Sequence, residues 1–155
     1  MLTVKLSDVS VETIRSEVIR ANDSEICGFL LGNRSAECLY VATVRPAENL
    51  YHSRTGFAIS QSDYDNAWSA ATDRLAVVGL YHSHYGSAHL SCLDRHNIAL
   101  TSLVWLVVGL RGGVECSIAE WRCFTWTPQG VKRLRLLQPR NVSQPLVSRD
   151  GSKLP

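Results

Sequence analysis

The stretch Leu75-Ala76-Val77-Val78-Gly79-Leu80-Tyr81-His82-Ser83-His84 decides how the rest of the chain is interpreted. Its apolar part is almost continuous, which predicts a central strand covered on both faces. His82 and His84 lie at the end of this strand, two positions apart. Because side chains alternate across a strand, both imidazoles project to the same face and can bind one metal ion.

The residue that completes this candidate metal site is Asp94, ten positions after His84. It falls in the first turn of a helix predicted at 91–101, so a short loop would bring its carboxylate back to the histidines. Two imidazoles and one carboxylate leave one position free for water on a tetrahedral Zn²⁺ ion, as in catalytic zinc sites. Such an ion lowers the pKa of its water to about 7 and polarises a carbonyl, as amide hydrolysis requires.

Two further polar residues have the chemistry that hydrolysis needs. Glu25 stands alone at the entrance to the apolar segment 26–31, where a carboxylate is unfavourable unless it has a partner or a task. We interpret it as the general base, the alternative being a surface carboxylate at the start of a strand. Ser91 is a candidate donor to the developing oxyanion. The pattern Ser-x-x-Asp is also a helix-capping signature, so an N-cap role for Ser91 stays open.

The surrounding sequence predicts an α/β domain of the α+β type, with one central mixed β-sheet and about three helices. Hydrophobic periodicity predicts helices at 8–21, 62–73 and 91–101, the first capped by Ser7 or Ser10. Arg45-Pro46 is expected to end the second strand. The predicted strands are 25–31, 38–44, 57–60, 75–84, 104–110, 114–126 and 130–138.

Length and composition limit the classes of protein that this chain can represent. Its 155 residues fit one domain, which we expect at 1–138, followed by a flexible C-terminal tail at 139–155. A hydrophobic content of 45% and a charged content of 19% exclude global disorder. The net charge of +2 is too balanced to indicate a nucleic-acid or membrane surface. We interpret the basic residues after Gly130 as a solvated edge strand and tail, the alternative being a contact with an acidic partner.

The compartment is predicted from cysteine usage and from the apolar runs. The start of the sequence shows no secretory signal, and the apolar runs are shorter than the ~20 residues that cross a bilayer. The five cysteines are an odd number and include no C-x-x-C pair, which favours reduced thiols and a cytoplasmic protein. Cys27 and Cys92 lie beside the candidate site, and each is either a packing residue or an extra zinc ligand.

At these residues the chain resembles the JAMM family of zinc metalloproteases, also called JAB or MPN+. The family pattern appears here as Glu25, His82-Ser83-His84 and Ser91-Cys92-Leu93-Asp94. The resemblance extends over about 6–137. It includes the segments 24–32, 46–49, 57–59 and 78–81 in the family's order.

The resemblance implies a minimal, single-domain member of the prokaryotic type with the MPN/JAB, cytidine-deaminase-like fold. It also implies hydrolysis of the isopeptide or peptide bond at the C-terminus of a ubiquitin-like or sulfur-carrier protein. In that reaction His82, His84 and Asp94 bind zinc, Glu25 is the acid and base, and Ser91 stabilises the oxyanion. No nucleic-acid or membrane partner is expected, and we expect the tail of the substrate to pair with a sheet edge.

The chain departs from the family pattern in the loop between the histidines and the serine. This loop, residues 85–90, is one residue shorter than usual, and Tyr85 and Leu90 stand where prolines are common. We expect Ser91 and Asp94 to keep their roles because their mutual spacing is intact, with His89 as the competing ligand otherwise. Two alternatives stay open: a non-catalytic MPN scaffold that binds a partner protein, and a processing peptidase for a small sulfur carrier.

Overall fold

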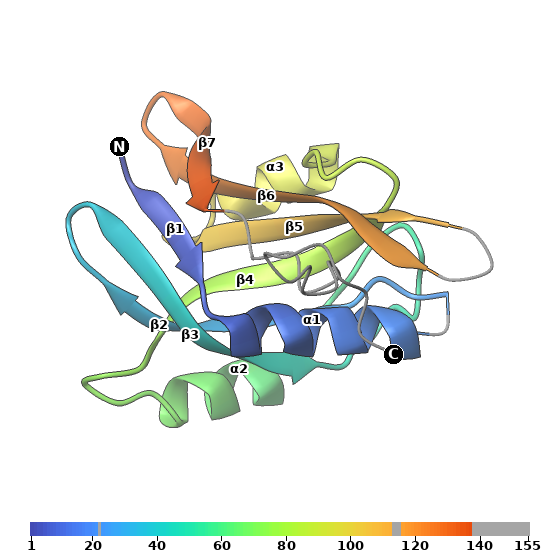
Figure 1. Ribbon diagram of the computed structural model, residues 1–155, viewed down its shortest axis with the longest axis horizontal. Helices are drawn as coiled ribbons and strands as arrows, with labels where there is room; N and C mark the ends of the chain where they lie inside the picture. Colours follow the sequence, from blue (N-terminus) through green and yellow to red (C-terminus); the bar gives the residue numbers. More distant parts are fainter. Residues whose placement is uncertain (22, 113–115, 138–155) are drawn as a thin grey trace, which may run out of the picture.

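The mixed sheet and the three helices expected from the sequence are both present (Figure 1). The computed structural model describes residues 1–21, 23–112 and 116–137, so the predicted tail at 139–155 lies outside the described residues. The elements are β1 (Thr3–Leu6), α1 (Asp8–Arg20), β2 (Cys27–Arg34), β3 (Cys38–Ala47), α2 (Gln61–Ser69), β4 (Ala76–Tyr85), α3 (Cys92–Ile98), β5 (Val104–Arg111), β6 (Ser117–Thr127) and β7 (Gly130–Leu137).

The described strands follow the order β1-β3-β2-β4-β5-β6-β7 and close into a barrel, because β1 pairs in parallel with both β3 and β7. The apolar strand β4 is central, with β2 antiparallel on one side and β5 parallel on the other. A parallel neighbour needs a crossover connection, and α3 lies in the one between β4 and β5. This crossover brings the start of α3 back toward the end of β4.

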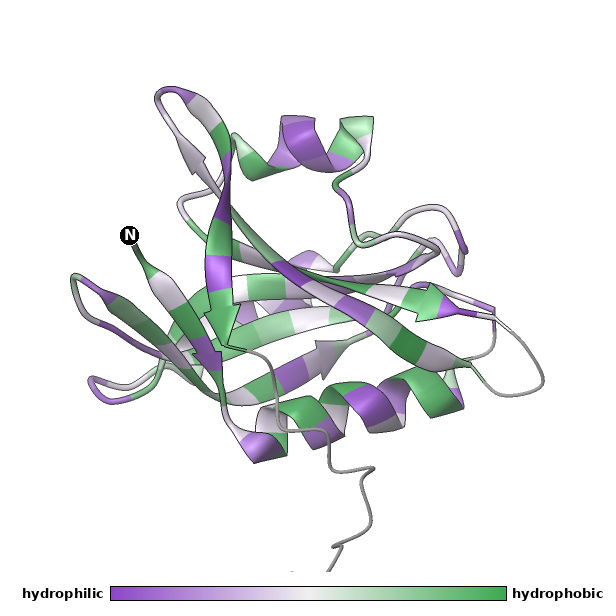
Figure 2. Cartoon of the chain, turned by 45° about the horizontal axis from the view of Figure 1, so that its top comes forward, coloured by the Kyte–Doolittle hydropathy of each residue, from purple (hydrophilic) through white to green (hydrophobic). Residues whose placement is uncertain are grey.

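Side-chain alternation along β4 separates the core into two parts. Tyr81 belongs to a cluster that includes Ile14 and Val18 of α1, whereas Leu80 belongs to a cluster that includes Ala67 of α2 and Ile98 of α3. Accordingly, α1 and α3 lie on opposite sides of the sheet (Figure 2). None of the described helices is long and apolar enough to span a bilayer.

Two predictions about the strands between β2 and β4 are wrong. Arg45-Pro46 does not end β3, which continues to Ala47. Since β1 pairs with β3 only as far as Val41, Pro46 lies where the strand has lost one neighbour, and a residue without an N–H is tolerated there. The predicted strand 57–60 is an irregular segment, held to the preceding turn by the bond from the Leu50 amide to the Ala58 carbonyl (2.9 Å).

Both ends of the described chain differ from what the sequence predicts. Strand β1 was not predicted, because its four residues are too few to show a pattern. The edge strand expected after Gly130 is wrong, because β7 pairs with β6 and, through Arg135–Leu137, with β1. The side chains of Lys132 and Arg133 are exposed, as expected for a solvated strand.

Candidate metal centre

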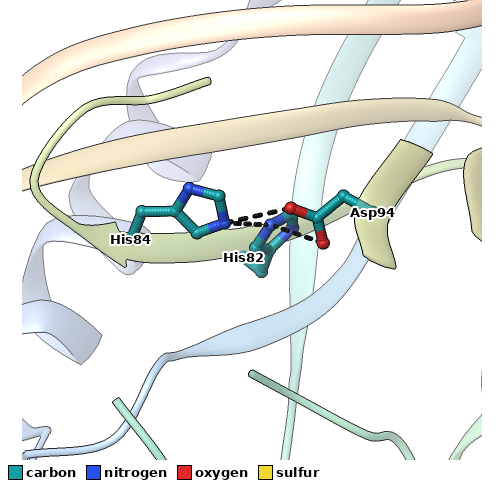
Figure 3. A group of neighbouring side chains, drawn as sticks. All are labelled: His82, His84 and Asp94. Carbon is teal, nitrogen blue, oxygen red and sulfur yellow. Dashed lines mark hydrogen bonds and ion pairs between the residues drawn. The ribbon is translucent and has the colours of Figure 1, made fainter. Parts of the chain in front are cut away.

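The structure brings His82, His84 and Asp94 together at the end of β4 (Figure 3). The Nε2 atoms of the two histidines are 3.0 Å apart. Asp94 reaches His84 Nε2 with Oδ2 at 3.1 Å and His82 Nε2 with Oδ1 at 3.5 Å. Within the described part of the chain, this is the group of three whose side chains could hold a metal ion.

The separations of the three donor atoms fit a bound metal ion. Ligands at about 2.0–2.1 Å from a tetrahedral ion lie about 3.3–3.4 Å from one another. The observed separations run from 3.0 to 3.5 Å and so span that value, with Asp94 facing each histidine through a different oxygen. Two imidazole nitrogens and one carboxylate oxygen also form a donor set that divalent transition metals accept. The site therefore has both the geometry and the chemistry of a three-ligand metal centre.

A capping box fixes the aspartate in this group. Ser91 is the N-cap of α3, and its Oγ accepts a hydrogen bond from the Asp94 amide at 3.1 Å. In return, the Asp94 Oδ2 atom accepts a hydrogen bond from the Ser91 amide at 2.8 Å. The same carboxylate oxygen faces His84, so the cap holds Asp94 in the rotamer that points at the histidines.

Burial, hydrogen bonding and neighbouring charge together set the charge states of the two histidines and of the aspartate. The His82 side chain is fully buried, stacked on Phe57 with ring centroids 4.5 Å apart, and burial lowers its pKa. Burial also acts to lower the pKa of His84, but hydrogen bonding and the charge of Asp94 raise it overall. Burial acts to raise the pKa of Asp94, but hydrogen bonds from both histidines hold it well below its usual range. The group therefore has the ionised carboxylate that a metal site requires.

Glu25 lies next to this group, two residues before β2 begins. Its side chain is buried, with 4% of the residue exposed, and burial raises its pKa to about 7. The charge of His84 lowers this pKa and that of Asp94 raises it, which places the Glu25 carboxyl within electrostatic reach of both. Its backbone amide donates to the Ser53 carbonyl at 2.7 Å. Glu25 is thus a buried, tethered carboxyl group and not a surface carboxylate.

The comparisons with known proteins agree with this geometry. The family of prokaryotic homologs of the JAB domain matches residues 8–126. The chain belongs to this family. None of the curated proteins matches the sequence of this JAB domain significantly.

Two solved structures resemble this JAB domain over nearly its whole length. The solution structure of a protein from Desulfitobacterium hafniense has a TM-score of 0.69 at 23% identity, and covers 90% of this chain and 95% of its own. The solution structure of a protein from Salinibacter ruber has a TM-score of 0.63 at 28% identity, and covers 94% of this chain and 95% of its own. At these sequence identities, the two structures establish a similar fold and nothing about activity.

Ser91 has the structural role that its sequence pattern left open. Its hydroxyl oxygen accepts from the Asp94 amide, so the hydroxyl proton is still available to a ligand. The Ser91 residue is exposed and lies three positions before Asp94. The capping role is therefore observed, and the oxyanion role stays a prediction that this geometry allows.

The alternative ligands do not join the metal group of this JAB domain. Cys27 is fully buried, its thiol contacts the Ala47 carbonyl at 3.7 Å, and burial raises its pKa to about 12, so it stays a thiol. Cys92 is exposed on α3 and is not among the grouped residues. His89 contacts Ser87 and Arg122 with its two ring nitrogens. The short loop therefore does not bring His89 to the site.

Three residues that the sequence analysis did not assign also build the site. Phe57 covers the His82 ring, in a segment mistaken for a strand. Ser83 lies between the two histidines and its Oγ accepts a hydrogen bond from the Ile26 amide at 2.9 Å, which anchors the residue after Glu25. Asn49 donates from Nδ2 to the Glu25 carbonyl at 3.1 Å and to the Gly56 carbonyl at 3.0 Å. Ser83 lies between the two histidines, and Asn49 lies in the segment 46–49 that resembles the family. These positions were the signal that could have identified both residues.

A groove of about 540 Å³ lies at the end of β4. Its lining includes Tyr85 and Gly86, which follow His84 directly, but none of the three residues of the metal group. Arg54 lies over the Tyr85 ring, 4.3 Å from the ring centroid. The complete lining is Arg54, Tyr85, Gly86, Ser87, Leu110, Arg111, Gly112, Ala119 and Glu120.

Proposed function

We propose that this JAB domain is a zinc-dependent isopeptidase or peptidase, which hydrolyses the amide bond at the C-terminus of a ubiquitin-like or sulfur-carrier protein. The observation that carries the proposal is the convergence of His82, His84 and Asp94, with donor atoms within 4.8 Å of one another, beside the buried carboxyl of Glu25. An MPN scaffold that only binds a partner has no need of this arrangement.

Zinc is the metal that the donor set favours. Imidazole and carboxylate ligands with near-tetrahedral separations are typical of catalytic zinc sites with three protein ligands. When bound, zinc lowers the pKa of a coordinated water and polarises the carbonyl of the scissile bond. The odd number of cysteines, without a C-x-x-C pair, supports the reducing conditions of the cytoplasm as the place of the reaction.

Glu25 and Ser91 supply the proton transfer and the oxyanion contact. A pKa of about 7 suits a group that takes a proton from the attacking water and then returns it to the leaving amine. Ser91 donates its free hydroxyl proton to the carbonyl oxygen as negative charge develops there. Asn49 and Ser83 keep the Glu25 segment in place during both transfers.

The groove beside Tyr85 is the proposed path of the substrate tail. The strands of the described chain form a closed barrel, so pairing of the tail along a whole free edge strand has little support. A groove of about 540 Å³ whose lining begins at the residue after His84 suits an extended chain better than a folded region, which favours a flexible C-terminal tail.

The proposal is tested with purified protein and substrates in which a ubiquitin-like or sulfur-carrier protein carries a C-terminal extension. We expect one zinc per chain, cleavage at the end of the ubiquitin-like part by mass spectrometry, and loss of cleavage with a chelator. His84→Asn should lose both zinc and cleavage. His96→Asn, which changes an exposed histidine of α3, should keep both. Protein that binds zinc but cleaves none of these substrates would contradict the substrate class, and protein without zinc would favour the scaffold.

A further inference from the structure

The loop of residues 85–90, which we call the ligand loop, joins the two elements that carry the metal group. His82 and His84 precede it on β4, and Asp94 follows it on α3. The loop lacks the rigidity that proline would give, and Gly86 adopts a φ of 122° within it. Contacts with other elements must therefore hold it in one conformation.

The ligand loop packs directly on the backbone of β5. The Gly86 amide donates to the Leu110 carbonyl at 3.0 Å. A Cβ atom at Gly109 would lie 2.5 Å from the Gly86 carbonyl oxygen and 2.8 Å from the Ala88 nitrogen, so the close approach requires glycine at this position. Ala88 and Leu90 are buried in the cluster beneath the loop.

Strand register places Glu120 where it can reach over this glycine. Gly109 of β5 pairs with His84 of β4 on one side and with Glu120 of β6 on the other. Paired residues on neighbouring strands project to the same face, so the His84 and Glu120 side chains flank the position where Gly109 has none. The ligand loop crosses the sheet at this level.

Glu120 and Arg122 hold the loop from β6. Glu120 Oε2 accepts a hydrogen bond from the Ala88 amide at 2.9 Å, and its Oε1 accepts one from Arg122 Nη2 at 3.1 Å. The bond from the Ala88 amide holds the pKa of Glu120 below its usual range, so the acceptor is a carboxylate. Arg122 also contacts His89 Nε2 through Nη1. One ion pair therefore contacts two successive residues of the loop.

The hydrogen bonds of His89 extend this contact to Ser87. A guanidinium group only donates, so His89 Nε2 is an acceptor, and the proton on its Nδ1 is donated to Ser87 Oγ. Ser87 is therefore held in place and is not activated as a nucleophile. Ser87 lies three residues after His84, whose Nε2 faces His82 and Asp94.

We propose that Glu120 and Arg122 act as positioning residues, which hold the ligand loop so that His84 before it and Asp94 after it stay in place for a metal. The role in catalysis rests on the proposed function, whereas the anchoring of the ligand loop does not. Partners of this kind around metal ligands affect metal affinity by about 10- to 100-fold. The ion pair of Glu120 and Arg122 supplies the rigidity that the ligand loop lacks in its own sequence.

The first test compares Glu120→Ala with Glu120→Gln and with Glu37→Ala, which removes an exposed glutamate on another part of the chain. NMR of the metal-free proteins gives the exchange rate of the Ala88 amide. We expect Glu120→Ala to speed this exchange, because the amide loses its acceptor. Glu120→Gln retains an acceptor oxygen and should restore most of the protection, and Glu37→Ala should match the wild type.

The second test measures zinc affinity by competition with a chromogenic chelator, together with kcat and KM. Glu120→Ala should bind zinc about 10-fold or more weakly. At saturating zinc it should lower kcat more than it raises KM. Wild-type exchange and zinc affinity in Glu120→Ala would overturn the proposal. If the wild type bound no zinc, the proposed function would fail, and the NMR measurement would still decide whether Glu120 and Arg122 hold the ligand loop.

Discussion

A glutamate lies on each face of β4, one buried and one partly buried, and the two differ in the groups that surround them. Glu25 lies on the face that carries His82 and His84, and Glu17 of α1 lies on the face that carries Tyr81. Burial raises the pKa of both carboxyl groups to about 7. If a raised pKa were enough to identify a catalytic group, the two would be equivalent candidates.

The groups next to each carboxyl distinguish Glu17 from Glu25. The Tyr81 hydroxyl donates a hydrogen bond to Glu17 Oε2, and the charge of Arg20 lies nearby, so Glu17 has a structural partner. For Glu25 the neighbouring charges are those of His84 and Asp94, and Asn49 binds its backbone carbonyl and not its carboxylate. The comparison shows that burial produces the pKa shift, whereas the neighbouring residues determine what the group can do.

The largest expected effect comes from replacing each glutamate with glutamine. Glu25→Gln should reduce kcat by about 10²- to 10⁴-fold, because the amide cannot accept the proton of the attacking water. Zinc content should be unchanged, since Glu25 is not one of the grouped donors. Glu17→Gln should change kcat by less than about 3-fold, because Glu17 does not contact the metal group. Steady-state kinetics and metal analysis of both variants test this difference.

Equal losses of activity in the two variants would contradict the assignment of Glu25 as the base. Such a result would mean that the sheet transmits a change on either face, or that both variants are partly unfolded. Circular dichroism and thermal unfolding of each variant separate these two cases. Full activity in Glu25→Gln would contradict the assignment outright.

The metal group was predictable because its geometry depends on local rules. Alternation along one strand places His82 and His84 on the same face, and the capping signature places Asp94 in the first turn of α3. Neither rule needs information from distant parts of the chain. The central position of β4 was predictable for the same reason, since its apolar run is continuous.

The supporting contacts were not predictable because they depend on pairing between distant segments. Glu120 reaches the Ala88 amide only because β5 and β6 pair with Gly109 opposite Glu120. Phe57 covers His82 from a segment without regular structure. Closure of the barrel likewise depends on β1 meeting β7, which lies at the other end of the described chain.

A smaller effect is expected from two serines that cap helices on opposite faces. Ser91 caps α3 beside the metal group, and Ser7 caps α1, accepting from the Ser10 amide at 3.0 Å. Replacing either with alanine should cost about 1 kcal/mol in the free energy of unfolding, from the lost cap. Ser91→Ala should also lower kcat by about 10²- to 10³-fold if the hydroxyl contacts the oxyanion. Ser7→Ala should leave kcat unchanged.

Ser91→Thr separates the two roles, because threonine keeps both a capping oxygen and a hydroxyl donor. It should recover most of the stability and much of the kcat that Ser91→Ala loses. Urea unfolding and steady-state kinetics on the same samples give both quantities. A Ser91→Ala variant that is less stable but fully active would show that the capping role is the whole role of Ser91.

A second effect, on stability alone, is the pH dependence that Glu17 contributes. The pKa of Glu17 is about 4.5 in the unfolded chain and about 7 in the folded protein. Between these two pH values, the folded state therefore holds a proton that the unfolded chain has lost. The stability that this group contributes is therefore fully present below about pH 4.5, and is lost as the pH rises through about 7. The difference between the two pKa values corresponds to at most about 3 kcal/mol, and partial solvent contact reduces it to about 1–3 kcal/mol.

Glu17→Gln isolates this contribution because glutamine has nearly the same shape, can accept the Tyr81 hydrogen bond and does not titrate. Glu25 has a pKa shifted in the same direction, so the wild type alone cannot assign the effect. Urea unfolding of both proteins at pH 5 and pH 8 should show that the wild type loses about 1–3 kcal/mol more than the variant over this range. Parallel losses would mean that Glu17 is ionised in the folded protein, with Arg20 and the Tyr81 hydroxyl outweighing burial. In that case the two faces of β4 would differ in the protonation of their glutamates as well as in their neighbours.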